Sequence, residues 1–393
     1  MQPLEIRNSV GWESRINNAL TQRRCTWSYR ERVPVKGGNN RLIQYENRCY
    51  INFSSNDYLG LAYHPKVIKA WQDYASLEGV GAGGSGHVIG YSSHHQQLEK
   101  WLANWLGFPR ALLFTSGFAA NYSLIRTLVA SGDHILADRL SHASLLEAAI
   151  YSPATLLRFA HNNPNSLKRL LHRSCNGNRL IVTEGVFSMN GDVAPLEELK
   201  KVICGTGSWL MLDDAHGIGV IGEEGRGCSW EKKNQPDLLV VSFGKAVGVS
   251  GAAVLCTEQV AEYLLQFARH LIYSTALPPA QIAAIHVALN IVRHEDSLRQ
   301  RLLENIAYFR KGIENYGFML SSSKTAIQPL IIGDNLRTLQ LAHRLRERGI
   351  WLTAMRPPTV PPGNAQLRIT LTATHLAEDI NMLLEALSNE RKG

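Results

Sequence analysis

The chain has 393 residues, 45% of them hydrophobic and 8% aromatic, which is enough to bury a large core and is about the length of a two-domain protein. Charged residues make up only 19%, and no stretch is rich in Pro, Gln or Ser, which excludes a disordered or low-complexity chain. The formal net charge is +8, but Lys and Arg form no long basic run, so we favour a basic surface that suits anionic small molecules and expect no nucleic-acid partner.

The N-terminal segment is expected to form an arm over residues 1–52. Its pattern predicts a polar amphipathic helix from Trp12 to Arg32, a glycine-rich turn at 37–40 and short strands at 42–43 and 50–53. From Pro65 onward, helical patterns alternate with short apolar runs, which predicts a parallel sheet covered by helices. We therefore expect a large α/β domain over 53–285, with strands at 111–115, 134–138, 179–185, 209–214, 238–244 and 252–256.

A second, smaller domain is expected over residues 286–393. The run YSTALPP at 273–279 breaks the pattern and precedes a long helix-like stretch to about Tyr316. Beyond it, the periodicity predicts an α+β fold with strands at 326–332, 350–355 and 366–371 and helices at 335–348 and from about 376.

The cysteines and the N-terminus indicate a cellular compartment. The six cysteines include no C-x-x-C pair, so neither a metal site nor a disulfide framework is expected. The first sixteen residues, MQPLEIRNSVGWESRI, contain no apolar signal segment, and no apolar run approaches the about 18 residues of a membrane span. We therefore expect a cytoplasmic protein with no membrane partner.

Two charged residues end apolar strands that should lie inside the sheet. The run WLMLDDAHG ends in Asp213, with His216 on the following turn, and the next run, LLVVSFGKAVG, delivers Lys245. Ligands bind at the carboxyl ends of the strands in such sheets, and a buried carboxylate needs a cationic partner there. The alternative for Lys245 alone is a surface lysine with its ammonium group in water, but the neighbouring Asp-x-x-His strand end disfavours it.

Pyridoxal phosphate (PLP) requires both of these groups. A buried carboxylate keeps the pyridine nitrogen protonated, so that the ring accepts electrons, while a lysine amine forms an imine with the aldehyde. Asp213 and Lys245 match these roles. The run TSGFAAN, which begins at Thr115, starts a helix after a strand and offers N–H donors to a phosphate, with Gly117 allowing close approach.

Other strand ends carry weaker signals. His142 and Ser188 lie in loops that follow apolar strands, so both are expected to face the ring, although a single loop histidine is more often a surface residue. TSGF by itself is more typical of an ordinary capped helix, and its place after a strand is what favours a phosphate site. The run GAGGSG at 81–86 has the G-x-G-x-x-G spacing of a dinucleotide-binding turn, but it follows a helical pattern at 66–78, so we interpret it as a flexible loop near the substrate.

Eight runs of the sequence resemble the α-oxoamine synthases. The resemblance extends from about Trp12 to Leu387, and several runs are too long to match by chance. They are SSNDYLGLAYHP (54–65), GAGGSGHVIGYSSHHQQLE (81–99), TSGFAAN, DRLSHASLLEA, TEGVFSMNGD, LDDAHGIGVIGEEGRG, VVSFGKAVGVSGAA and RPPTVPPGNAQLRITLT.

The resemblance implies a fold-type I PLP-dependent transferase with a mostly parallel sheet, helices on both faces, a small α+β C-terminal domain and an N-terminal arm. Such enzymes are homodimers with the active site at the subunit interface, and they join an amino acid to an acyl thioester with loss of carbon dioxide. The run RPPTVP at 356–361 favours the branch that takes L-alanine and a pimeloyl thioester in biotin biosynthesis. Whether acyl-carrier protein or coenzyme A carries the acyl group stays open.

The resemblance also implies roles for the matching residues. Lys245 resembles the Schiff-base lysine, Asp213 the partner of the pyridine nitrogen and His142 the histidine stacked on the ring. The remaining cofactor-binding residues are partners of the phenolic oxygen or lie at the phosphate end, and these are Ser188, His216, Gly117, Phe118 and Ser242. The family more often has Thr at the last position, and Ser242 keeps the hydroxyl donor. The pair Ser274–Thr275 resembles a segment that reaches the phosphate of the neighbouring subunit.

Substrate contacts are implied in the same way. Arg368 with Asn56 would bind the carboxylate of the amino acid, since guanidinium and carboxylate groups pair in a bidentate manner. Arg30, Arg356 and Thr359 fall to the acyl side. Without the resemblance, each arginine is equally a surface ion-pair residue worth under about 1 kcal/mol, and for Arg30 that interpretation is favoured.

Three other functions compete with this assignment. A sister synthase would use glycine with an acetyl or succinyl thioester, or serine with a palmitoyl thioester. A non-catalytic paralogue would lack the lysine, whereas Lys245 and Asp213 are both present. A nicotinamide dehydrogenase would have to use the glycines at 81–86.

Overall fold

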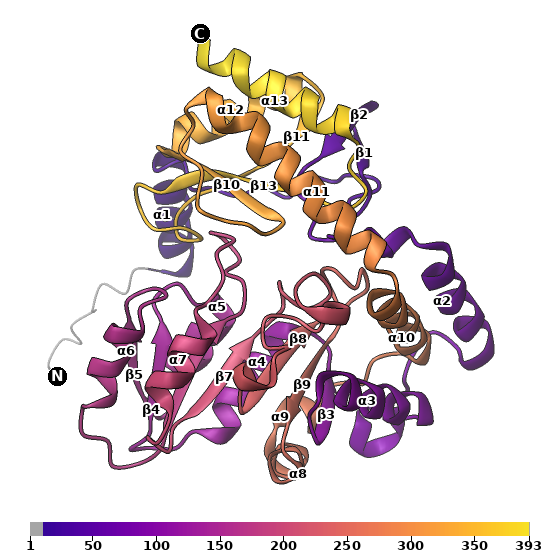
Figure 1. Ribbon diagram of the computed structural model, residues 1–393, viewed down its shortest axis with the longest axis vertical. Helices are drawn as coiled ribbons and strands as arrows, with labels where there is room; N and C mark the ends of the chain where they lie inside the picture. Colours follow the sequence, from indigo (N-terminus) through magenta and orange to yellow (C-terminus); the bar gives the residue numbers. More distant parts are fainter. Residues whose placement is uncertain (1–10, 393) are drawn as a thin grey trace, which may run out of the picture.

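A computed structural model describes residues 11–392, which form two lobes (Figure 1). The large lobe holds a seven-stranded sheet and its helices, and the small lobe holds the described chain from Asp296 onward together with two N-terminal strands. The helices are α1 (Trp12–Cys25), α2 (Pro65–Glu78), α3 (Ser93–Leu106), α4 (Gly117–Leu128), α5 (Ala143–Ile150), α6 (Pro164–Leu171), α7 (Leu196–Ile203), α8 (Glu258–Phe267), α9 (Arg269–Tyr273), α10 (Pro279–His294), α11 (Asp296–Ile313), α12 (Asn335–Glu347) and α13 (Ala377–Lys392). The strands are β1 (Leu42–Tyr45), β2 (Arg48–Asn52), β3 (Arg110–Phe114), β4 (His134–Asp138), β5 (Thr155–Phe159), β6 (Arg179–Glu184), β7 (Trp209–Asp213), β8 (Leu238–Ser242), β9 (Ala252–Cys256), β10 (Ile327–Gly333), β11 (Ile350–Trp351), β12 (Thr353–Met355) and β13 (Ala365–Thr370).

The sheet of the large lobe has the strand order β3-β9-β8-β7-β6-β4-β5. Its strands β8, β7, β6, β4 and β5 are parallel, and β9 is antiparallel to both of its neighbours. The connection from β8 to β9, residues 243–251, holds no helix, and so short a link joins antiparallel strands. The expected α/β fold with a mostly parallel sheet is confirmed.

Both faces of this sheet are buried, because alternate residues of one strand enter different cores. In β7, Leu210 and Leu212 belong to one apolar cluster and Met211 belongs to another. This explains why the inner strands are continuous apolar runs instead of alternating ones. The edge strand β5 was not among the expected strands, since it is half exposed and its apolar run is short.

The small lobe contains two three-stranded sheets, β10-β13-β12 and β1-β2-β11. The run 350–355, expected to be one strand, is divided at Leu352 into β11 and β12, which belong to different sheets. Strand β11 pairs in parallel with β2, so the N-terminal strands lie beside the C-terminal part of the chain. The domain limits expected from the sequence stay a prediction.

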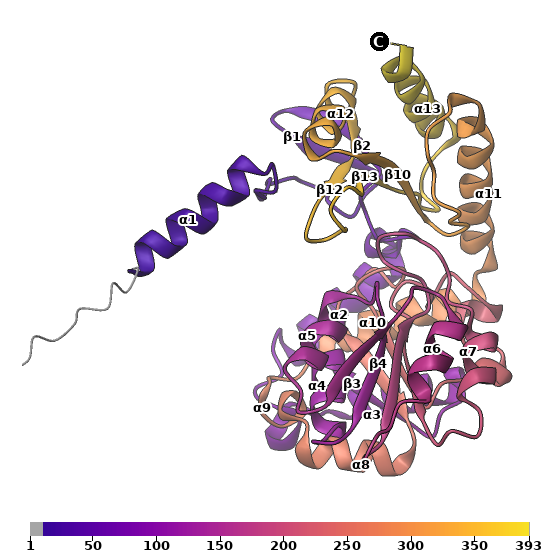
Figure 2. The same cartoon turned by 90° about the vertical axis from the view of Figure 1, so that its left-hand side faces the viewer.

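Two helical expectations change in the structure. Helix α1 ends at Cys25, short of the expected Arg32, has no buried residue and projects from the body of the molecule (Figure 2). The long stretch to Tyr316 consists of α10 and α11, which meet at Glu295.

The glycines at 81–86 follow helix α2, so the strand that a dinucleotide-binding turn requires does not precede them. Within residues 11–392, no helix is both long and apolar enough to cross a membrane.

Candidate active site

The expected catalytic residues lie together at the carboxyl ends of four neighbouring parallel strands of the large lobe. Strand β7 ends in Asp213, and the loop after β8 carries Lys245. The loops after β4 and β6 carry His142 and Ser188. Parallel strands end on the same side, so tertiary structure joins residues that lie far apart in the sequence.

Asp213 is 7% exposed and is held by two N–H donors. The amide Nδ2 of Asn121 donates to Asp213 Oδ2 at 2.6 Å, and the backbone N–H of Ala215 donates to Oδ1 at 3.0 Å. Asn121 comes from helix α4, and its Nδ2 also donates to Ser144 Oγ at 2.9 Å. These bonds fix the plane of the carboxylate, and the sequence analysis did not identify Asn121 as a site residue. The sequence feature that could have indicated Asn121 is its place one helical turn after Gly117.

His142 is linked to the same hydrogen-bond network. Its Nδ1 lies 2.8 Å from Ser144 Oγ and accepts from the backbone N–H of Ser144 at 3.2 Å. Because that backbone group can only donate, the neutral ring carries its proton on Nε2. His142 is exposed, but the protein around it removes part of its hydration, and this desolvation lowers the pKa of His142. The charge of Asp213 opposes the shift, and the charge of Lys245 reinforces it.

Lys245 lies in the turn after β8 and is partly buried. Burial lowers the pKa of Lys245 to about 8, although the negative charges of Asp213 and Glu184 oppose the shift. An ordinary lysine has a pKa near about 10.4, so far more of this amine is unprotonated at neutral pH. A surface lysine with its ammonium group in water would not show this shift.

Glu184 is a buried acid that the sequence analysis overlooked. It ends β6, is 2% exposed, and its Oε1 has no hydrogen-bond partner within the described part of the chain. Burial raises the pKa of Glu184 well above its usual value, and the neighbouring charge of Asp213 raises it further. The signal was available, since TEG places an acid at the end of an apolar strand as LDD does. We call Asn121, His142, Glu184, Asp213 and Lys245 the strand-end cluster.

The expected phosphate end lies at the N-terminus of α4. Ser116 caps this helix, its Oγ accepting from the backbone N–H of Ala119 at 3.1 Å. A Cβ on Gly117 would lie 3.7 Å from Ser242 Cβ, so these two residues are in contact distance. Phe118 is exposed at the start of the same helix. A helix N-terminus flanked by a hydroxyl group provides the donors that an anion needs.

A second network joins the two lobes above the cluster. Arg368, 4% exposed on strand β13, donates from Nη1 to Asn56 Oδ1 at 3.0 Å and from Nε to the carbonyl oxygen of Ser188 at 2.8 Å. His216 Nδ1 lies 2.6 Å from the hydroxyl of Tyr58, which donates to Asn56 Oδ1 at 3.3 Å. Burial lowers the pKa of His216 well below its usual value, and the nearby positive charge of Lys245 lowers it further. Tyr58 was not among the expected site residues.

Two groups of expected residues lie apart from this site. Arg30 Nη2 donates to Thr359 Oγ1 at 2.6 Å, and Arg356 Nη2 donates to the carbonyl oxygen of Tyr29 at 3.2 Å. We call Arg30, Arg356 and Thr359 the Arg30 cluster. Within residues 11–392, no hydrogen bond connects it to the strand-end cluster.

The pair Ser274–Thr275 lines a different cavity of about 380 Å³. This cavity lies beside the end of β3 and the segment 86–99. Its lining does not include Lys245 or Asp213. In this chain the pair is therefore separate from the strand-end cluster.

The residues at the sheet edge fit PLP. Asp213 is a buried, oriented carboxylate suited to a protonated pyridine nitrogen, and Lys245 is an amine whose pKa is lowered toward neutrality. His142 is exposed at the crevice, and the N-terminus of α4 offers the N–H donors that a phosphate group would need. The buried Oε1 of Glu184 has no hydrogen-bond partner within residues 11–392, which fits a crevice that can take a further polar group.

Comparisons with known proteins agree with this fit. The family described as aminotransferase class I and II matches residues 48–387. The 8-amino-7-oxononanoate synthase of Sodalis glossinidius is 71% identical over 379 residues, which cover 96% of this chain and 98% of that protein. The synthase of the same name from Pectobacterium atrosepticum is 57% identical over 378 residues, with 96% and 98% covered.

Solved structures show the same architecture. Serine palmitoyltransferase from Sphingomonas wittichii is 28% identical, with a TM-score of 0.91 over 96% of this chain and 98% of that one. The 8-amino-7-oxononanoate synthase from Francisella tularensis is 32% identical, with a TM-score of 0.77 over 87% and 98%. A serine palmitoyltransferase from S. paucimobilis, 26% identical with a TM-score of 0.91 over 96% and 98%, has PLP and myriocin bound. The chain therefore belongs to the PLP-dependent aminotransferase class I and II family, and within it to the 8-amino-7-oxononanoate synthases.

Proposed function

We propose that the protein condenses L-alanine with a pimeloyl thioester, releasing carbon dioxide and the free thiol carrier, to give 8-amino-7-oxononanoate for biotin biosynthesis. The observation that carries this proposal is 71% identity over nearly the whole chain to a synthase of that name, together with a lysine and an oriented aspartate at one sheet edge. The glycine- or serine-using alternative is disfavoured, since the serine palmitoyltransferases are only 26–28% identical.

Bound PLP supplies an electron sink for negative charge at the α-carbon of the amino acid. Lys245 would hold the cofactor covalently, and Asp213 would keep the proton on its pyridine nitrogen. The Asn121 and Ala215 N–H groups support this role, because they fix the carboxylate without neutralising it. His142 would cover the ring, Ser188 and His216 would face the phenolic oxygen, and the phosphate end falls to Gly117, Phe118 and Ser242.

Lys245 also acts as the base that removes the α-proton of L-alanine. An amine with a pKa of about 8 is a better proton acceptor at neutral pH than an ordinary lysine, because a larger fraction of it is unprotonated. Burial and the charge of Asp213 both raise the pKa of the neighbouring Glu184. His142 holds a proton on Nε2 and can donate it in a hydrogen bond to the new ketone oxygen.

Arg368 would bind the carboxylate of L-alanine with the help of Asn56. Its Nε and Nη1 are bonded within the protein, so Nη2 is the remaining donor in the described chain that can turn toward a ligand. A guanidinium group fixed on two sides is preorganised, so little entropy is lost on binding. The Arg30 cluster would contact the acyl chain or its carrier, and both acyl-carrier protein and coenzyme A remain candidates.

We also propose that the enzyme is a cytoplasmic homodimer in which each active site includes the partner's Ser274–Thr275 segment. Trp12 and Ile16, 73% and 52% exposed, lie one turn apart on the projecting helix α1, and such an apolar stripe is suited to packing on a second copy. All six cysteines are free thiols, which supports a reducing compartment.

The decisive experiment is an absorbance titration of the purified holoenzyme with L-alanine, glycine and serine, followed by turnover with pimeloyl thioesters of coenzyme A and acyl-carrier protein. We expect spectral change and product with L-alanine, and far less with the other two amino acids. Preference for glycine or serine would refute the assigned substrate.

A further inference from the structure

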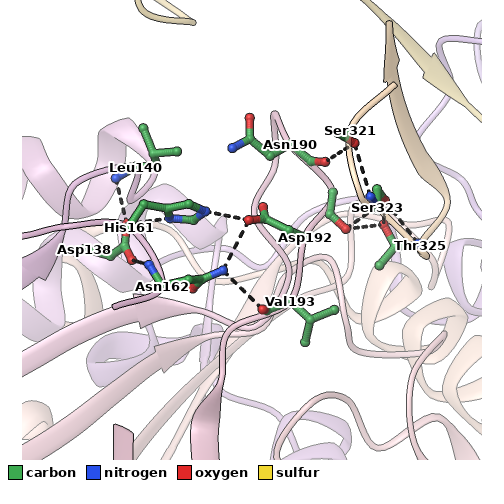
Figure 3. Close-up of polar contacts among 11 residues, drawn as sticks. Asp138, Leu140, His161, Asn162, Asn190, Asp192, Val193, Ser321, Ser323 and Thr325 are labelled. Carbon is green, nitrogen blue, oxygen red and sulfur yellow. Dashed lines mark hydrogen bonds and ion pairs between the residues drawn. The ribbon is translucent and has the colours of Figure 1, made fainter. Parts of the chain in front are cut away.

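The loop at 185–193, between β6 and α7, is held by both lobes (Figure 3). It carries Ser188 and turns back on itself, since the backbone N–H of Phe187 donates to the carbonyl oxygen of Asp192 at 2.9 Å and that of Gly191 donates to the carbonyl oxygen of Phe187 at 2.8 Å. A loop fixed in this way can set the position of one lobe relative to the other.

The small lobe binds this loop through four consecutive backbone carbonyl groups. Every one of the carbonyl oxygens of residues 188–191 accepts a hydrogen bond from a small-lobe side chain. The donors are Arg368 Nε to Ser188 (2.8 Å), Gln366 Nε2 to Met189 (2.8 Å), Ser321 Oγ to Asn190 (3.1 Å), and Ser323 Oγ and Thr325 Oγ1 to Gly191 (both 2.9 Å).

Gly191 makes this close approach possible. Its φ is +69°, and a Cβ there would collide with the carbonyl oxygen of Ile327 and with Ser323 Oγ. The small lobe, with Arg368, is therefore attached to the large lobe at this loop.

The large lobe holds the other side of the loop through His161. Its Nδ1 lies 2.9 Å from Asp138 Oδ1 and its Nε2 lies 2.6 Å from Asp192 Oδ2. Burial alone would lower the pKa of His161, but the hydrogen bonds to Asp138 and Asp192 outweigh it and raise the pKa to about 9. Because carboxylates only accept, both ring nitrogens donate and the ring is an imidazolium at neutral pH.

The same network reaches the loop that carries His142. Asp138, whose side chain is fully buried, also accepts from the backbone N–H of Leu140 at 2.8 Å and from that of Asn162 at 2.8 Å. Asn162 Nδ2 donates to Asp192 Oδ2 at 3.2 Å. Asp138 from β4 and Asp192 from the loop are the charged groups that face His161. The pair of carboxylates with one cation thus ties together the loops after β4, β5 and β6.

We propose that His161, held as a cation between Asp138 and Asp192, is a positioning residue that fixes loop 185–193 and, through it, Arg368 over the active site. His161 contacts neither substrate nor cofactor in this role. The inference rests on the proposed function for its kinetic consequence, while the effect on the loop itself does not depend on catalysis.

The test uses PLP-loaded protein and the variants His161→Gln and Asp192→Asn, with exposed His172→Gln as the matched control. We expect the amides of residues 185–193 to exchange hydrogen at least about tenfold faster in both variants, while the absorbance of bound PLP is retained. KM for L-alanine should rise at least about tenfold with a smaller change in kcat, because Arg368 loses its fixed position. The His172→Gln control should match the wild type.

The pH dependence of KM provides a second arm, which starts from the wild type. In the wild type, KM for L-alanine should rise as pH increases through about 9, where His161 loses its proton. In Asp192→Asn the rise should begin at lower pH, because one of the two carboxylates that stabilise the cation is gone.

Wild-type exchange rates in both variants, or a pH profile of KM that is unchanged by Asp192→Asn, would overturn the proposal. If His161→Gln does not fold, Asp192→Asn decides together with the wild-type profile. If the proposed function is wrong, the wild type will not turn over L-alanine, yet the exchange difference will still appear.

Discussion

At the carboxyl end of an inner strand of the large sheet, Asp213 is 7% exposed and accepts hydrogen bonds from Asn121 and Ala215. Arg30, in the N-terminal segment, is by contrast exposed and has Thr359 as its side-chain partner. The strand-end cluster gathers at the ends of buried parallel strands, and the Arg30 cluster consists of exposed or half-buried side chains on surface segments. Buried groups with several bonds have one position, so their removal should be costly. An exposed group with a single side-chain partner, such as Arg30, can adapt, so its removal should have a mild effect.

The largest effect is expected for Lys245→Ala. Loss of the amine removes both the covalent link to PLP and the base, so the visible absorbance of the bound cofactor should disappear and kcat should fall by at least about 10³-fold. An absorbance spectrum and a turnover assay measure both. Exposed Lys201→Ala is the control, and retention of turnover by Lys245→Ala would remove the basis of the proposed mechanism.

Arg368→Lys should give the next largest effect. Lysine keeps the charge but loses the planar donors that bind Ser188 and Asn56, so KM for L-alanine should rise roughly tenfold to hundredfold, as expected for about 1.5–3 kcal/mol of charge-assisted hydrogen bonding. Steady-state kinetics checks this, with exposed Arg337→Lys as the control. An unchanged KM would show that the carboxylate binds elsewhere.

Asn121→Ala should weaken the strand-end cluster without abolishing it. One of the two N–H donors to Asp213 is lost, and we expect PLP affinity and kcat together to fall by about tenfold. Fluorescence titration of the apo-protein with PLP measures the first effect. Asn121→Asp, which places a second carboxylate beside Asp213, should be worse than alanine, and the reverse order would contradict the role given to Asn121.

The smallest effect is expected for Arg30→Ala. An exposed pair is worth under about 1 kcal/mol, so KM for the pimeloyl thioester should rise less than about fivefold, and KM for L-alanine should not change. A change in the alanine constant of similar size would place Arg30 at the amino acid and remove the distinction between the two clusters.

The sequence by itself determined the inner strands and the principal residues at their ends. Strands β4 and β9 have the expected limits, because a strand buried on both faces must be apolar throughout and is bounded by polar residues. For the same reason, charges such as Asp213 and Lys245 stood out at the ends of apolar runs. The roles of the arginines came from resemblance alone, since a surface arginine has no comparable local pattern.

Tertiary structure alone decided which groups meet. The bonds of Asn121 to Asp213, Tyr58 to His216 and His161 to Asp192 join residues distant in sequence, and no local pattern encodes such pairs. It also decided the antiparallel direction of β9 and the division of 350–355 between two sheets. Periodicity reports whether a side chain is buried, but the partner of a buried polar group is fixed only when the strands have been placed side by side.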